Sequence, residues 1–126
     1  MKASPKDFAI SFPLTLQKRL PKEIIVISLS KPQSAALNRR YRKKRKPTNV
    51  LSFFYSPEYG EIILCPTVIR VEAKAAGNTY EYQMTWMVIH GMLHLSGIHH
   101  EASGKAEQQF ERIEQAVLRK YQGLKT

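Results

Sequence analysis

The sequence contains a single cysteine, Cys65, and no long apolar stretch. One thiol cannot form a disulfide within the chain, so a secreted scaffold stabilised by internal disulfides is excluded. The apolar runs are only a few residues long, whereas a membrane-spanning helix needs roughly 18 to 20. Residues 1–14 have no apolar stretch ending in a small-residue cleavage site, so we expect no signal peptide. We therefore expect a cytoplasmic protein with no membrane partner.

Acidic residues are scarce: 10 Asp and Glu stand against 20 Lys and Arg, a formal net charge of +10 over 126 residues. Such an excess favours a polyanionic partner such as nucleic acid. Seven of the eight residues from 39 to 46 are basic. A solvated loop that aids solubility is the alternative interpretation. We expect the basic residues of this segment to contact nucleic acid: Arg39, Arg40, Arg42, Lys43, Lys44, Arg45 and Lys46.

Short segments rich in Ile, Val and Phe predict strands in the first half of the chain. Residues 8–12 and 23–30 have this composition and are bounded by prolines. Residues 49–55 and 61–65 form a second pair, and the residues between them suit a hairpin turn. A helical pattern starts at Ser34, carries Arg and Lys in its last turn, and ends before a proline.

Helical periodicity dominates the second half of the chain. Residues 68–76 and 104–121 each predict a helix. Residues 80–95 are apolar on most of their circumference, which predicts a buried central helix. This order of elements predicts an α+β fold, with a small mixed sheet of about four strands packed against helices in one domain, residues 1–126.

All four histidines lie within residues 90–100, at the end of the predicted central helix. His90 and His94 are four residues apart, so on a helix both imidazoles lie on one face and can bind one ion. Gly97 can take the left-handed conformation that ends a helix, which lets His100 turn back as a third ligand. A pair of ordinary helical histidines is favoured on the four-residue spacing alone, but the glycine and third histidine reverse that preference.

The number of ligands distinguishes a catalytic from a structural metal site. Three histidines leave one tetrahedral position for water, as in catalytic zinc sites. His99 adjoins His100, and either can complete the triad, or both can close a structural site. Nickel, copper and iron also suit such ligands.

The spacing of His90, His94, Gly97 and His100 matches the metzincin signature of metalloproteases. Those enzymes need a glutamate directly after the first histidine as general base, and this chain has Gly91 there. The pattern therefore favours a metal site and disfavours peptide hydrolysis.

Two segments, HGMLHLSGIHHE and LNRRYRKKRKPTNVLSF, together resemble the YbeY family of bacterial ribosomal-RNA maturation endoribonucleases. The resemblance covers residues 37–101. It implies that His90, His94 and His100 bind zinc, and that Arg42 is the arginine associated with catalysis. It also favours His100 over its neighbour as the third ligand.

Three positions depart from the motifs of that family. His99, Asn49 and Glu61 stand where the resemblance leads us to expect aspartates. The loss of a carboxylate at residue 99 changes what can orient a ligand or accept a proton. The segment between the first two predicted strands is also short, so a helix of the family has little room there.

The resemblance implies a zinc-dependent, single-strand-specific endoribonuclease with one ion per chain. Its expected role is the maturation of the 16S rRNA 3′ end and ribosome quality control, with the small ribosomal subunit as partner, and we expect a monomer. The ion would activate a water, or the RNA 2′-hydroxyl would attack, while Arg42 would hold the phosphate. No motif places a general base, although His99 is a candidate. Tyr41, Tyr55 and Tyr59 can stack on unpaired bases, but helical spacing favours Tyr41 as a core residue.

Two other functions remain as alternatives. One is a noncatalytic ribosome-assembly or RNA-binding factor with a structural metal. The other is a metal hydrolase of another substrate class, against which Gly91 and the net charge of +10 both argue.

Overall fold

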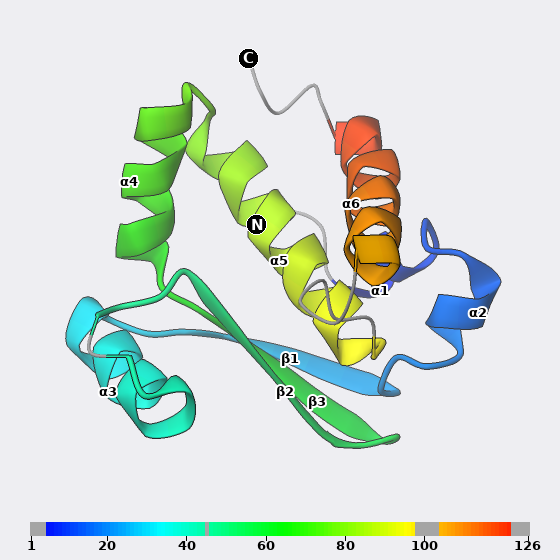
Figure 1. Ribbon diagram of the computed structural model, residues 1–126, viewed down its shortest axis with the longest axis horizontal. Coiled ribbons are helices and arrows are strands. Elements are labelled where there is room, and N and C mark those ends of the chain that lie inside the picture. Colours follow the sequence, from blue (N-terminus) through cyan, green and yellow to red (C-terminus); the bar gives the residue numbers. More distant parts are fainter. Residues whose placement is uncertain (1–4, 45, 98–103, 122–126) are drawn as a thin grey trace.

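The computed structural model describes residues 5–44, 46–97 and 104–121, which form helices around a small sheet (Figure 1). The helices are α1 (Pro5–Ala9), α2 (Leu14–Gln17), α3 (Lys31–Arg42), α4 (Pro66–Ala76), α5 (Tyr80–Leu95) and α6 (Gly104–Leu118). The strands are β1 (Glu23–Ser28), β2 (Val50–Ser56) and β3 (Tyr59–Leu64). The predicted α+β class is confirmed. None of the helices in these ranges is long and apolar enough to cross a membrane.

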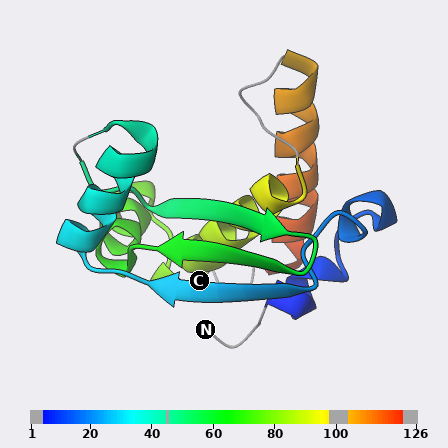
Figure 2. The same ribbon diagram turned by 90° about the horizontal axis from the view of Figure 1, so that it is seen from below.

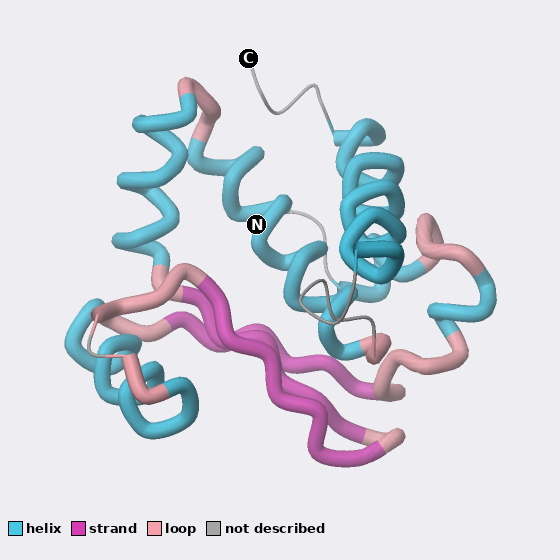
Figure 3. Tube along the Cα trace, viewed as in Figure 1, coloured by secondary structure: helices cyan, strands magenta, loops and turns pink. Residues whose placement is uncertain are grey.

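The sheet is mixed and has the strand order β1-β3-β2. β2 and β3 form an antiparallel hairpin, as predicted, and β1 pairs with β3 in parallel. β2 is therefore an edge strand. Helices α4, α5 and α6 lie on one side of the sheet (Figure 3), and the view in Figure 2 shows the strands in front of them. The inner face of the sheet is the one that faces α5, and the outer face is the opposite one.

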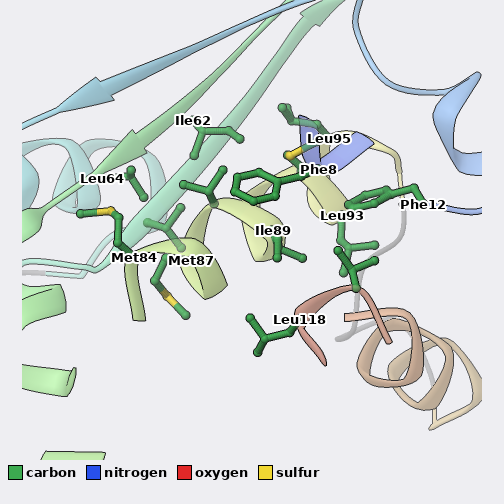
Figure 4. Packing of buried hydrophobic residues seen from close by; sticks show 14 of the residues in the cluster. Phe8, Phe12, Ile62, Leu64, Met84, Met87, Ile89, Leu93, Leu95 and Leu118 are labelled. Atoms are coloured by element: carbon green, nitrogen blue, oxygen red, sulfur yellow. The ribbon is translucent and has the colours of Figure 1, made fainter. Parts of the chain in front are cut away.

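The core lies between α5 and the inner face of the sheet. Ile62 and Leu64 of β3 are at most 2% exposed, and Val88, Ile89, Met92 and Leu93 of α5 are completely buried. All six belong to one buried cluster with Phe8 and Phe12 from the N-terminal segment and Leu118 from α6, and Figure 4 shows part of this cluster from close by. The predicted buried central helix is confirmed, with the bounds expected from the sequence.

The prediction of a strand at residues 8–12 is wrong, and the sheet has three strands in the described part of the chain rather than about four. Residues 8 and 9 belong to α1, and a turn follows in which the N–H of Phe12 donates to the carbonyl of Ala9 at 3.0 Å. Phe8, Phe12 and Leu16 are all buried. Their spacing of four residues is typical of helical structure. The phenylalanine and isoleucine content of residues 8–12 nevertheless favoured a strand.

Helix α3 begins earlier and ends earlier than the sequence predicted. Ser30 caps it in a capping box with Gln33, so the first helical residue is Lys31. Lys43 ends it in the left-handed conformation, with φ 57°, well before Pro47. The predicted concentration of arginine in its last turn is confirmed.

Candidate metal site and cleft

His90 and His94 lie one turn apart near the end of α5, and both side chains are partly buried. Their Nε2 atoms are 3.2 Å apart. Two nitrogen ligands of a tetrahedral zinc ion, each at roughly 2.0–2.1 Å from it, are separated by about 3.3 Å. The pair therefore fits two ligand positions of one zinc ion.

The same separation allows a hydrogen bond in which one Nε2–H donates to the other ring. A metal ion instead requires the lone pairs of both Nε2 atoms. The third predicted ligand, His100, and its neighbour His99 lie outside the described residues. Among the residues that are described, no group of three potential metal ligands occurs. The triad of His90, His94 and His100 therefore stays a prediction. The structure shows that the first two lie close enough to bind one ion.

Glu114 of α6 contacts the opposite side of the His90 ring. The Nδ1 atom of His90 is 2.7 Å from Oε2 of Glu114, and the glutamate is only 6% exposed. When Nδ1–H donates to this carboxylate, the Nε2 lone pair faces His94. A carboxylate in this position fixes the tautomer and orientation of a metal-binding histidine. The sequence alone does not reveal Glu114, because its contact with His90 across 24 residues depends on how α6 packs against α5.

Gly91 is buried where α5 crosses the sheet, and its carbonyl accepts a hydrogen bond from Ser52 Oγ at 3.0 Å. A Cβ atom at this position would meet Ser52 Oγ at 2.9 Å and Ile62 Cγ2 at 3.0 Å. The glutamate that metalloproteases carry after the first histidine therefore has no room here. The structure strengthens the argument against peptide hydrolysis.

The histidine pair opens into a cleft of about 1100 Å³ that also contains Arg42. This volume is slightly larger than that of ordinary small-molecule pockets, which measure roughly 300–1,000 Å³. Val50, Leu51, Ser52 and Phe54 of β2 line the cleft, and the end of α5 together with the residues after it contributes as far as Gly97. Arg42, His90 and His94, predicted from separate motifs, thus share one cavity.

Hydrogen bonds from α3 anchor the loop that follows this helix. They give a structural role to Asn38 of the segment LNRRYRKKRKPTNVLSF. Ser34 Oγ donates to the carbonyl of Thr48 at 2.9 Å and accepts from its N–H at 3.0 Å. The buried side chain of Asn38 donates to the carbonyl of Lys46 at 2.8 Å. These bonds close the loop against α3, so that Arg42 and Thr48 both line the cleft.

The other described residues of the basic segment do not line this cleft. Arg39, Arg40, Lys43, Lys44 and Lys46 are exposed, and Arg45 is outside the described residues. Their contact with RNA stays a prediction. Tyr41 is 54% exposed, so the prediction that it is a core residue is wrong. Its ring packs on Phe53 with centroids 5.1 Å apart, on the outer face.

The fold and the cleft define a class: an α+β protein with a histidine pair on a buried helix and an arginine in the same cavity. Residues 8–122 match the family model described as Endoribonuclease YbeY. The chain belongs to the YbeY family.

Several proteins named Endoribonuclease YbeY are similar to this chain. The one from Thermotoga neapolitana is 44% identical over 69% of this chain and 60% of its own length. The one from Methylococcus capsulatus is 41% identical over 77% of this chain and 69% of its own length. The solution structure of a Thermotoga maritima protein covers 94% of this chain and 83% of that protein, with 25% identity and a TM-score of 0.56. The chain thus spans less than two thirds of the Thermotoga neapolitana relative.

Proposed function

We propose that this protein is an endoribonuclease that cleaves single-stranded RNA with one zinc ion. The observation that carries the proposal is the 3.2 Å separation of the two histidine Nε2 atoms in a cleft that also holds Arg42. Membership of the YbeY family and the net charge of +10 support RNA as the substrate.

In this proposal His90, His94 and His100 hold the ion, and Glu114 orients His90 through its Nδ1 atom. A zinc ion in this position, when bound, supplies an acidified water and stabilises negative charge on phosphate oxygens. Arg42 binds the phosphate through two guanidinium N–H groups and stabilises the charge that develops there.

The biological substrate that we propose is the precursor of the small-subunit ribosomal RNA. The protein would trim the 16S rRNA 3′ end and take part in ribosome quality control, in contact with the small subunit in the cytoplasm. The relatives' names support cleavage of RNA, and the choice of ribosomal RNA rests on the resemblance carried by residues 37–101.

The test is cleavage of a single-stranded RNA by purified protein of measured zinc content. Wild type is compared with His94→Ala and with Glu107→Ala, an exposed acidic residue of α6 used as a control for handling. We expect cleavage by wild type and the control, and none by His94→Ala with an unchanged circular dichroism spectrum. Equal cleavage by all three would identify a contaminating nuclease and contradict the proposal.

A further inference from the structure

The cleft contains a second group of cations, which the sequence motifs do not include. Lys18, Arg19 and Lys22 line it from the segment between α2 and β1, and all three are exposed. Lys22 forms a surface ion pair with Glu58 at 3.3 Å, which compensates part of its charge. Lys18 and Arg19 are therefore the two cations of this group that matter most for an anion in the cleft.

These cations and Arg42 are at opposite ends of β2. The N–H of Lys22 donates to the carbonyl of Pro57 at 3.0 Å, which places this segment beside the hairpin turn. Arg42 belongs to the other end, because Thr48, just before β2, is tied to α3 by Ser34. Figure 2 shows α2 and α3 beyond the two ends of β2. The strand has seven residues and is about 20 Å long at roughly 3.4 Å per residue.

Phe54 lies on β2 between the two cationic ends of the cleft. It is on the inner face, opposite Gly60 in the register, and its side chain is 51% exposed while lining the cleft. A half-exposed phenyl ring among cations is a surface on which a nucleic acid base can stack, and such stacking is independent of base identity.

We propose, building on the function proposed above, that a single RNA strand lies along β2 with phosphates bound at both ends. Lys18 and Arg19 bind the backbone at the hairpin end, Arg42 binds it at the other end, and Phe54 stacks on an unpaired base between them. A paired base is not available for this stacking, so the cleft selects unpaired RNA.

The first experiment measures binding of a fluorescent 12-nucleotide single-stranded RNA to the full chain by anisotropy, over a range of salt concentrations. A denaturing gel confirms that the strand is uncut. The variant Lys18→Ala/Arg19→Ala is compared with Arg119→Ala/Lys120→Ala, an equally basic, exposed pair after α6 that does not line the cleft. We expect a Kd about 10-fold higher for the first pair and within 2-fold of wild type for the second.

The salt dependence separates direct phosphate contacts from a general loss of charge. Each phosphate contact with a single strand contributes about 0.7 to the slope of log K against log salt concentration. Lys18→Ala/Arg19→Ala should therefore reduce the slope by about 1.4. Equal slopes and equal Kd changes in the two double variants would overturn the proposal.

The second experiment tests the stacking residue. Phe54→Leu keeps an apolar side chain but removes the ring, and Phe54→Trp restores an aromatic surface. We expect Phe54→Leu to weaken binding about 5- to 10-fold for the single strand, Phe54→Trp to recover it, and neither to change binding of the same sequence in a duplex. Tyr55→Ala, which changes an exposed aromatic of the outer face, is the control. Equal losses for single strand and duplex would contradict selection by stacking.

Failure of this inference differs from failure of the proposed function. A protein that cleaves RNA but binds equally well after Lys18→Ala/Arg19→Ala is a nuclease with another RNA path. A protein that depends on these residues for binding but never cleaves is an RNA-binding factor.

Discussion

The two faces of the sheet both carry exposed aromatic side chains, but among the described residues the inner face places one of them in a cleft with a histidine pair and an arginine. On the inner face, Phe54 shares a cleft with Arg42, His90 and His94. On the outer face, Phe53, Tyr55 and Tyr59 form a row with ring centroids 6.3 and 5.7 Å apart.

The two tyrosine hydroxyls of the outer row both have a hydrogen-bond acceptor on the same face. Tyr55 and Tyr59 both donate to the carboxylate of Glu61, at 3.0 and 2.6 Å. The hydrogen bond to Glu61 raises the pKa of Tyr59 to about 12, because it is made by the protonated hydroxyl and the carboxylate disfavours a phenolate beside it. Exposed aromatics alone therefore do not identify a site here; the neighbouring charges and histidines do. We expect substitutions on the inner face to change function and those on the outer face to leave it unchanged.

The largest effect is expected for His94→Ala, which removes one of the two paired Nε2 atoms. Zinc binding at micromolar concentration should be lost, because two remaining ligands hold the ion poorly. Isothermal titration calorimetry measures it, with circular dichroism to confirm the fold. Tight binding of one zinc equivalent by this variant would place the metal elsewhere.

Arg42→Lys comes next, since it keeps the charge but loses the planar pair of N–H donors. We expect kcat for single-stranded RNA to fall by about 100-fold, the scale reported for losing one oriented donor to a developing anion. A KM that changes less than kcat would support a role in the transition state. An unchanged kcat would mean that Arg42 contacts the RNA backbone without stabilising the transition state.

Glu114→Gln tests whether the buried carboxylate orients His90. The amide can accept the same hydrogen bond without its charge, and we expect zinc affinity to fall by about 10- to 100-fold. Competition with a chromophoric chelator measures this directly. Glu111→Gln, an exposed neighbour on α6, is the matched control and should bind zinc like wild type. Equal affinities for the two variants would make Glu114 a structural residue only.

Gly91→Ala should lower stability, because the new Cβ would lie 2.9 Å from Ser52 Oγ and 3.0 Å from Ile62 Cγ2. Overpacking of this kind costs about 1–3 kcal/mol, partly offset by the higher helix propensity of alanine. Urea unfolding measures the change. Gly104→Ala, where a Cβ meets no atom within 4 Å, should be neutral or stabilising. A Gly91→Ala variant as stable as wild type would mean that α5 can move away from the sheet.

The smallest effect is expected for Tyr59→Phe on the outer face. It removes the 2.6 Å hydrogen bond to Glu61, but Glu61 still accepts from Tyr55, so the midpoint of urea unfolding should change little. Single-stranded RNA cleavage should be unchanged. A cleavage rate that falls as far as in Arg42→Lys would show that the outer face contributes to function, and the contrast between the two faces would be lost.

The sequence predicted most of what depends on local pattern. The bounds of α5 and the hairpin β2–β3 follow from periodicity and turn residues, and both are confirmed. The prediction of a strand at residues 8–12 is wrong because the composition of this segment is typical of a strand, whereas the four-residue spacing of the buried Phe8, Phe12 and Leu16 is typical of helical structure.

Contacts between elements that are distant along the chain could not be predicted from the sequence. Sequence motifs identify Arg42, His90 and His94 as site residues. No local pattern indicates that Glu114 contacts His90. Nor does any indicate that Lys18 and Arg19 line the same cleft. The charges of the basic segment are consecutive in the sequence, yet among its described residues Arg42 alone lines the cleft. Charge density along a chain does not show which charges converge in space.

The most direct test of a zinc-dependent nuclease is reconstitution. Protein freed of metal with a chelator and dialysed is titrated with zinc, and single-stranded RNA cleavage is measured at each step. We predict no cleavage at the start, and a linear recovery that saturates at one zinc equivalent per chain. Full cleavage by the metal-free protein, or zinc binding that restores no cleavage, would contradict the account.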